Sequence, residues 1–376
     1  MKTLRYAKRL IGFESASHLS NRVICKYLQM KLSKHGFIVE KIEYRDENRV
    51  RKVNLVAKKG AGQGGLAYFA HTDTVPADVW FSKKFGPYEA AVSKERLYGR
   101  GSCDMKGSIA CMLTASQRFQ WDDFKQPLYL VFTSDEEVGF HGARYITEES
   151  STYREMVEGC TRGIIGEPTS LEVVHAHKGM CIITAKSHGN AAHSSTSHGK
   201  NSNLAMIPFL SEMKRIHDEI ESDAKWQNSM FEPSTLSWNI VINDENRAAN
   251  VTSPGTTCTV YTRPIPGIDI TPLLDRAQQC AEDNGLEIEI FNADSAFQTP
   301  VENEFVKESL QLAHRQTPKT VSYGTDGGVF SELENLIVFG PGSIAQAHTK
   351  DEWIAIEQLT LGSEMHTKMI ERWCCN

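Results

Sequence analysis

The sequence predicts an α/β protein built from two domains, and three observations lead to this class. The chain has 376 residues, more than one hydrophobic core usually organises. Short apolar runs typical of buried strands alternate with amphipathic helical segments through residues 21–167, as in an open, largely parallel sheet. This pattern changes after about residue 178 and returns near residue 302. We therefore expect a smaller domain inserted into a larger one.

The larger domain is expected to comprise residues 1–177 and 293–376. Helical spacing of apolar residues predicts helices at 21–35, 107–119, 302–316 and 357–372. Apolar runs predict its strands at 38–44, 53–57, 66–70, 127–133, 163–165 and 336–339. In an open α/β sheet, the carboxyl ends of such strands face a crevice where ligands bind.

The inserted domain is expected to comprise residues 178–292. Its predicted elements are, in order, a strand at 181–187, a helix at 203–221, strands at 236–242 and 256–263, a helix at 271–284 and a strand at 287–291. The order βαββαβ is that of a ferredoxin-like α+β domain.

Composition excludes several classes of function. The net charge of −6 argues against a nucleic-acid-binding protein, and no apolar run reaches membrane-spanning length. Residues 1–13 lack the continuous apolar segment of a signal peptide. The nine cysteines show no disulfide framework, and Cys111 and Cys181 lie in apolar surroundings typical of buried reduced thiols. We therefore expect a cytoplasmic protein.

Residues 65–76, GLAYFAHTDTVP, form the centre of the predicted site. His71 and Asp73 stand at the carboxyl end of an expected buried strand. Because residues i and i+2 of an extended chain face the same way, one can bind a metal while the other supports it as a neighbouring carboxylate. Taken alone, a histidine after a strand is more often structural.

Further residues of metal-ligand type follow other predicted strands or open a predicted helix. They are Asp104, Glu136, Glu137, Glu167 and His348. Singly, each has an ordinary interpretation: a helix N-cap, two solvated loop acids, a turn residue and a loop histidine. Together they fall on one expected edge of the sheet. Two histidines with several carboxylates suit Zn²⁺, with Co²⁺ or Mn²⁺ as substitutes, and a shared carboxylate would hold two ions roughly 3.5–4 Å apart.

The motifs HTD, GSCDMKG, SDEEVG, GEPT and QAH, in this order, resemble the co-catalytic zinc amidohydrolases. That family includes aminoacylase, carboxypeptidase G, succinyl-diaminopimelate desuccinylase and acetylornithine deacetylase. The resemblance spans the chain and implies a zinc-exopeptidase-like α/β catalytic domain with a ferredoxin-like insert that forms a homodimer. It also implies two Zn²⁺ ions: His71 and Glu167 would hold one, Glu137 and His348 the other, and Asp104 would bridge them.

The same resemblance implies roles for residues around the ions. Asp73 would orient His71, and Glu136 would be the general base that takes a proton from a zinc-activated water. His193, in GNAAHSS, would stabilise the oxyanion in the partner subunit's site, although a loop histidine can also be merely exposed. Arg263 would clamp a carboxylate, with a surface salt bridge as its ordinary alternative. Further substrate contacts would come from Asn250, Gly324 and Thr325.

The motifs HKG, RPIPG, YGTDGG and GPGSIAQAH are most similar to acetylornithine deacetylase. We therefore expect a hydrolase that removes the acyl group of an N-acyl amino acid, with N2-acetylornithine as the first candidate. The segment NDENRAAN, Tyr261–Thr262 before Arg263, and Asp326 depart from that enzyme's pattern. Desuccinylase, aminoacylase or dipeptidase activity is the alternative within the family. A one-metal hydrolase and a non-catalytic binding protein on the same scaffold are the alternatives outside it.

Overall fold

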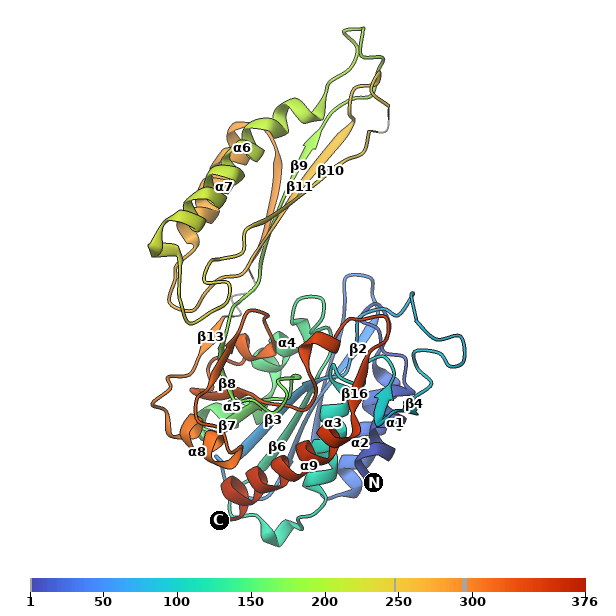
Figure 1. The fold of residues 1–376 in the computed structure, drawn as a ribbon, viewed down its shortest axis with the longest axis vertical. Helices are drawn as coiled ribbons and strands as arrows, with labels where there is room; N and C mark the ends of the chain where they lie inside the picture. The colour runs from blue at the N-terminus through green and yellow to red at the C-terminus, as the bar shows by residue number, and fades with distance from the viewer. Residues whose placement is uncertain (1, 247, 293–295) are drawn as a thin grey trace. The chain divides into compact units, whose positions relative to one another are not determined.

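The computed structural model describes residues 2–246, 248–292 and 296–376 (Figure 1). The chain divides into two compact units. Unit 1 comprises Met1–Ala176, Gln298–Lys319 and Thr325–Asn376, and unit 2 comprises His177–Phe297 and Thr320–Gly324. The predicted boundary between residues 292 and 293 borders residues 293–295, which lie outside the described residues.

Unit 1 is organised around a mixed sheet that has nine strands within the described residues. The strands, in spatial order, are β1 (Ile38–Arg45), β2 (Arg51–Lys59), β6 (Leu128–Thr133), β3 (Leu66–His71), β7 (Arg162–Ile165), β15 (Asn335–Val338), β8 (Val174–His177) and β13 (Phe297–Gln298). β14 (Lys319–Val321) pairs with β8. A separate small sheet joins β16 (Trp353–Ala355), β5 (Arg96–Tyr98) and β4 (Ala91–Ser93).

The centre of the large sheet is parallel and its flanks are antiparallel. β6, β3, β7 and β15 run parallel, so their carboxyl ends open at one edge. β1 and β2 pair antiparallel, as do β2 and β6, and β15 and β8. The expectation of a largely parallel sheet is therefore right only for the centre. The turn from Asp46 to Val50 explains one flank, because so short a connection joins only antiparallel strands.

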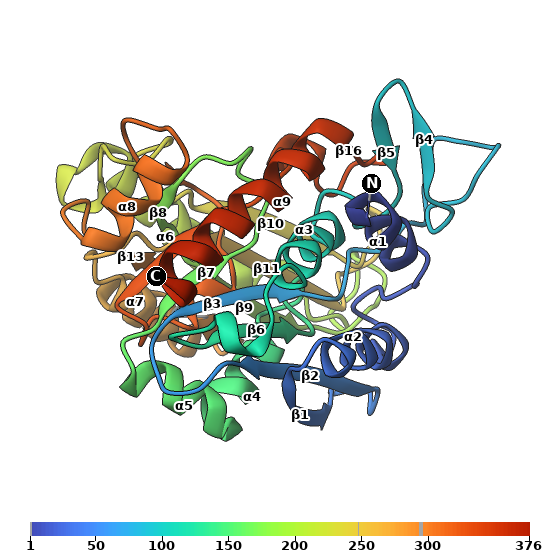
Figure 2. The same ribbon diagram turned by 90° about the horizontal axis from the view of Figure 1, so that it is seen from below.

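Helices cover both faces of this sheet (Figure 2). One face carries α1 (Lys2–Ile11), α2 (Arg22–Lys34), α3 (Lys106–Ser116), α8 (Glu304–Leu312) and α9 (Ile356–Ile370). The other carries α4 (His141–Glu149) and α5 (Ser151–Glu158), where Tyr153 packs on Phe330, which packs on Phe69 of β3. Every residue of β3 and β6 is consequently buried. No helix was predicted at α1, α4 or α5, because these elements of 10, 9 and 8 residues are shorter than the segments over which helical spacing is recognised.

Short helical turns complete unit 1. They are η1 (Trp121–Asp123), η3 (Asp326–Gly328), η4 (Ile344–Gln346) and the π-turn η5 (Glu371–Cys375). None of the nine cysteines, all of which the structure describes, forms a disulfide, and Cys111 and Cys181 are buried as predicted. None of the helices in the described part of the chain combines the length and apolar composition that crossing a membrane requires.

Unit 2 has the predicted order βαββαβ. Its elements are β9 (Cys181–His188), α6 (Ser202–Ser222) followed by the short turn η2 (Ala224–Trp226), β10 (Asn239–Asp244), β11 (Gly255–Thr262), α7 (Thr271–Asp283) and β12 (Glu287–Asn292). The strands form an antiparallel sheet in the order β10-β11-β9-β12, with α6 and α7 on one face (Figure 1). β11 alternates between buried and half-buried residues, as a sheet with one covered face requires.

Candidate metal centre

The carboxyl ends of β3, β6 and β7 bring polar side chains to one edge of the sheet. His71 is the last residue of β3 and lies opposite Thr133, the last residue of the adjacent parallel strand β6. Glu136 and Glu137 occupy the turn that follows β6, and Glu167 follows β7. Because neighbouring strands lie about 4.8 Å apart, residues at these ends come within reach of one another.

A buried carboxylate fixes the loop that carries Asp104. Glu352 is 1% exposed. Its Oε1 accepts hydrogen bonds from the backbone N–H groups of Cys103 (2.8 Å) and Asp104 (3.0 Å). Its Oε2 accepts from the Gly101 N–H (2.8 Å) and from Nη1 of Arg100 (2.9 Å). The loop before α3 is therefore held by one side chain from a distant part of the sequence.

Asp104 lies between the two predicted ligand histidines. Its Oδ1 is 2.9 Å from Nε2 of His71, and its Oδ2 is 3.4 Å from Nε2 of His348. Glu167 Oε1 lies 3.5 Å from Nε2 of His71, and Glu137 Oε2 lies 2.9 Å from Nε2 of His348. The five side chains thus form two groups of three that share Asp104. The side chain of His348 is 53% exposed, so the cluster reaches the surface there.

Asp73 contacts both His71 and the turn that carries Glu136 and Glu137. Nδ1 of His71 lies 3.0 Å from the main-chain oxygen of Asp73 and 3.7 Å from its carboxylate, so the closer contact is through the backbone. The Asp73 carboxylate instead accepts from the Ser17 hydroxyl (2.8 Å) and from the backbone N–H groups of Glu136 (3.3 Å) and Glu137 (3.4 Å). Asp73 therefore links the histidine to the turn that carries both glutamates.

The crowding of acids around the histidines shifts their protonation strongly. Burial by itself lowers the pKa of His71, but the hydrogen bond to Asp104 and the surrounding negative charges raise it well above its ordinary value. Hydrogen bonds to Asp104 and Glu137 raise the pKa of His348 to about 10. Burial, reinforced by the neighbouring carboxylates, raises the pKa of Glu167 well above its usual range. Such a cluster of acids favours a bound cation.

The donor set fits a divalent metal. Ligand atoms of His71, Asp104 and Glu137 all lie within 4.8 Å of one another. Within the described residues, Oε1 of Glu137 is buried and has no hydrogen-bond partner, which leaves an anionic oxygen to be satisfied. Imidazole nitrogens and carboxylate oxygens together are ligands that Zn²⁺ and related ions prefer.

Comparison with known proteins identifies the family. The sequence model of peptidase family M20/M25/M40 matches residues 67–372, most of the chain. The chain belongs to this family. The family predicted from the motifs is confirmed. The protein, called the M20 chain from here on after its family, is a hydrolase of a metal-dependent family.

Individual relatives agree with this membership. The M20 chain is 30% identical over 377 residues to the acetylornithine deacetylase of Myxococcus xanthus, covering 97% of this chain and 96% of that one. Its fold matches an M20 family metallo-carboxypeptidase from Sulfolobus solfataricus with a TM-score of 0.77 at 15% identity, over 99% of both chains. It also matches a dinuclear metal-binding M20 peptidase from Bacillus subtilis with a TM-score of 0.63 at 13% identity, over 98% of this chain and 96% of that one. These matches confirm the predicted fold class.

Most of the predicted substrate residues of the M20 chain belong to unit 2. His193 is exposed, and its Nδ1 lies 2.7 Å from the Ser195 hydroxyl. The Ser194 N–H donates to the Asn250 carbonyl (2.9 Å), so unit 2 brings the loops of His193 and Asn250 together. Arg263 follows β11, stacks on the Tyr261 ring at 4.8 Å and donates through Nη1 to the Gly179 carbonyl at 3.4 Å. Gly324 also belongs to unit 2.

Thr325 belongs to unit 1 and is fully buried. Its hydroxyl accepts a hydrogen bond from the Gly327 N–H at 3.0 Å, which caps η3. Asp326, next in sequence, accepts from the Thr133 hydroxyl at 2.6 Å and so joins this loop to the end of β6. Burial raises the pKa of Asp326 to about 7. Sequence reasoning noted Asp326 only as a departure from a pattern and did not place it beside the cluster.

A second supporting network was also missed. Lys52, 1% exposed, pairs through Nζ with Oδ1 of Asp135 at 2.6 Å, and the Tyr44 hydroxyl donates to the other oxygen of Asp135 at 2.7 Å. Lys52 also donates to the backbone carbonyls of Ser17 and Leu19. Because Asp135 immediately precedes Glu136, its contacts with Lys52 and Tyr44 hold the turn that carries Glu136 and Glu137. No local sequence signal marks Lys52, because its partners are far along the chain.

Proposed function

We propose that this M20 family hydrolase removes the acyl group of an N-acyl amino acid by metal-assisted amide hydrolysis, with N2-acetylornithine as its substrate. The observation that carries the proposal is the position of Asp104, whose two oxygens face His71 and His348 separately. That arrangement suits a carboxylate shared by two cations. The similarity to the Myxococcus xanthus acetylornithine deacetylase supports the choice of substrate.

In this proposal the site holds two Zn²⁺ ions. His71 and Glu167 would hold one, Glu137 and His348 would hold the other, and Asp104 would serve both groups. The dinuclear metal-binding M20 peptidase with the same fold supports two ions rather than one. When bound, the ions lower the pKa of water to about 7 and polarise the substrate carbonyl.

Glu136 acts as the general base. Glu136 is 9% exposed and its backbone N–H donates to Asp73. Its carboxyl group lies close enough to His71 and Glu167 for their charges to act on it, but it belongs to neither group of three. It accepts the proton of the attacking water and returns that proton to the nitrogen of the leaving amine. Asp73 fixes the position of His71 relative to the glutamate turn, because its main-chain oxygen contacts His71 and its carboxylate accepts from the backbone of that turn.

Arg263 binds the substrate carboxylate, aided by Asn250, Gly324 and Thr325. A guanidinium suits this task because its planar fork matches a carboxylate with two parallel hydrogen bonds. His193 stabilises the oxyanion in the site of a partner subunit. Its exposure and its proximity to the loop of Asn250 support a shared role in contacting substrate.

The homodimer forms through unit 2. β10 is an edge strand whose residues are almost all exposed, including Val241 (52%) and Ile242 (55%). α6 exposes Leu204 (67%) and Ile207 (57%), and Asn203 of α6 donates to Asp244 of β10 at 2.6 Å. Exposed apolar side chains beside an open strand edge are features of a self-pairing surface.

The catalytic proposal is tested by replacing Glu136 with Ala. We expect the variant to retain its metal by elemental analysis while kcat on N2-acetylornithine falls at least about a hundredfold, the loss typical of a missing general base. Glu364→Gln, at an exposed position of α9, is the control for an acid remote from the cluster. Near-normal kcat in the Glu136 variant would refute the assignment.

The substrate is tested with a panel of N2-acetylornithine, N-succinyl-diaminopimelate and simple dipeptides. We expect the highest kcat/KM for N2-acetylornithine. A preference for the succinyl compound would point to a desuccinylase, in line with Asp326 in the YGTDGG loop. No turnover of any compound by zinc-loaded protein would favour a binding protein on this scaffold.

The dimer is tested with Ile242→Lys. We expect sedimentation to show a dimer for the wild type and a monomer for this variant, because a buried lysine charge without a partner is costly. Val23→Lys, at a position of α2 that is 66% exposed, adds the same charge to unit 1 and is expected to leave the dimer intact. A wild-type monomer at every concentration would contradict the proposal.

A further inference from the structure

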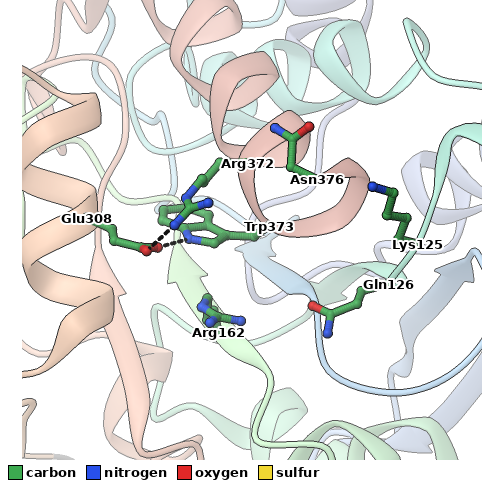
Figure 3. Close-up of a pocket in the computed structure, with 7 residues that line it drawn as sticks. All are labelled: Lys125, Gln126, Arg162, Glu308, Arg372, Trp373 and Asn376. Carbon is green, nitrogen blue, oxygen red and sulfur yellow. Dashed lines mark hydrogen bonds and ion pairs between the residues drawn. The ribbon is translucent and has the colours of Figure 1, made fainter.

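Unit 1 contains a cavity of about 350 Å³, whose lining residues Figure 3 shows, at the edge of the sheet opposite the metal centre. Its lining residues are Lys125, Gln126, Arg162, Glu308, Arg372, Trp373 and Asn376. Arg162 is the first residue of β7 and lies opposite the first residues of β3 and β15. Glu167 follows the other end of β7, so at about 3.3 Å per residue the two sites are roughly 15 Å apart along the chain.

Hydrogen bonds between separate elements hold the walls of this cavity. The backbone N–H groups of Lys125 and Gln126 donate to the Cys374 carbonyl at 2.7 and 3.0 Å. The Cys374 thiol donates to the Pro127 carbonyl at 3.4 Å, and the Arg162 N–H donates to the Gly65 carbonyl at 3.2 Å. The segment before β6, the start of β7 and the end of the last helix are therefore fixed together.

Basic side chains outnumber acidic ones around the cavity. Lys125, Arg162 and Arg372 contribute positive charge, and Glu308 is the acidic side chain among the lining residues. Both oxygens of Glu308 are already used: Oε1 accepts from Nη2 of Arg372 at 2.5 Å and Oε2 from Nε1 of Trp373 at 2.6 Å (Figure 3). Burial by itself raises the pKa of Glu308, but these two hydrogen bonds outweigh it and keep the carboxylate ionised.

Arg162 and Lys125 are not held in ion pairs with any described residue. Among the ion pairs found within the described residues, none includes either side chain. Arg162 is only partly exposed, so solvent cannot replace a counter-ion as fully as it does for a surface arginine. Its charge acts on Glu308 from beyond ion-pair distance. Figure 3 shows both side chains, with the Gln126 amide, around the same open space.

We propose that this cavity binds a small dianion, a phosphate or a dicarboxylate, between Arg162, Lys125 and Gln126. Arginine offers paired donors to either kind of oxyanion, lysine adds a point charge, and the glutamine amide adds a neutral donor. The volume exceeds that of inorganic phosphate and leaves room for a small metabolite that carries such a group. Binding bridges the start of β7 to the segment before β6 and thereby stabilises unit 1.

The proposal is tested on the zinc-loaded protein by calorimetric titration with inorganic phosphate and, separately, with malonate at low ionic strength. We expect at least one of the two to bind, and Arg162→Met to weaken that binding by at least about tenfold, the effect of losing a charge-assisted pair of hydrogen bonds. Lys125→Met is expected to weaken it several-fold. Arg22→Met removes the same charge from an exposed position of α2 and is expected to change nothing.

The outcomes separate this site from the metal centre and from the proposed hydrolysis. An anion held by the zinc ions would bind Arg162→Met and the wild type alike, and that result would overturn the proposal. Failure of both anions to bind the wild type at millimolar concentration would do the same. If Arg162→Met does not fold, the exposed Lys125→Met variant decides, and unchanged affinity there refutes the site. None of these readouts depends on turnover of an N-acyl amino acid.

Discussion

Replacing Glu352 with Gln tests how the loop of Asp104 is held. The carboxylate accepts hydrogen bonds from three backbone N–H groups and one guanidinium, at 2.8 to 3.0 Å. Glutamine has the same shape but only one acceptor oxygen, and its NH₂ group would face two donors. Whichever way the amide turns, either Arg100 and Gly101 or Cys103 and Asp104 lose their acceptor.

The expected loss of stability follows from those contacts. Each hydrogen bond to a charged group contributes about 1.5–3 kcal/mol, and the variant loses two of them in a buried site. We therefore expect the free energy of unfolding to fall by about 3–6 kcal/mol. Because the loop that carries Asp104 loses two of its four anchors in either orientation, we also expect metal affinity to fall about 10- to 100-fold, the usual effect of removing a residue that positions a ligand.

Urea unfolding followed by circular dichroism, on metal-free protein, measures the first effect, and titration with Zn²⁺ measures the second. Glu364→Gln, which makes the same change at an exposed position of α9, is the matched control and is expected to alter neither. If Glu352→Gln unfolds at the wild-type urea concentration and binds Zn²⁺ with wild-type affinity, Glu352 does not hold the Asp104 loop and the reasoning fails.

Three further predictions concern other parts of unit 1. Lys52→Met leaves Asp135 buried without its ion-pair partner, so we expect the free energy of unfolding, measured by urea titration, to fall by about 3–5 kcal/mol. An unchanged midpoint of the urea unfolding curve would refute the role of this pair. Burial between the rings of Tyr68 and Phe339 lowers the pKa of His366 to about 3. Below pH 6.5, His366 therefore becomes protonated in the unfolded chain while it stays neutral in the folded protein. Stability should therefore fall by about 1.4 kcal/mol per pH unit from pH 6.5 towards pH 4, and His366→Leu should remove that part of the slope, which urea titrations across this range measure. Chelation should abolish hydrolysis and lower Tm, added Zn²⁺ should restore both, and full activity after verified metal removal would contradict the proposed mechanism.

The positions of the clustered residues could be predicted because they depend on local pattern. His71 and Glu167 follow short apolar runs bounded by glycine or proline, and such runs form buried strands whose carboxyl ends meet at one edge. The ferredoxin-like order of unit 2 could likewise be predicted, although β10 begins at Asn239 rather than at residue 236. Strand limits depend on the partner strand, which sequence periodicity does not contain.

By itself the sequence determined the α/β class, the family and the residue types available for metal chemistry, because periodicity and short motifs are properties of neighbouring residues. Only the tertiary structure decided that Glu352 fixes the Asp104 loop, that Lys52 anchors the glutamate turn, and that Arg162 shares a cavity with Glu308. These partners lie many residues apart, and each becomes significant only when folding removes it from water beside another charge. Burial gives these pairs their energy, and burial is decided by the packing of the whole unit.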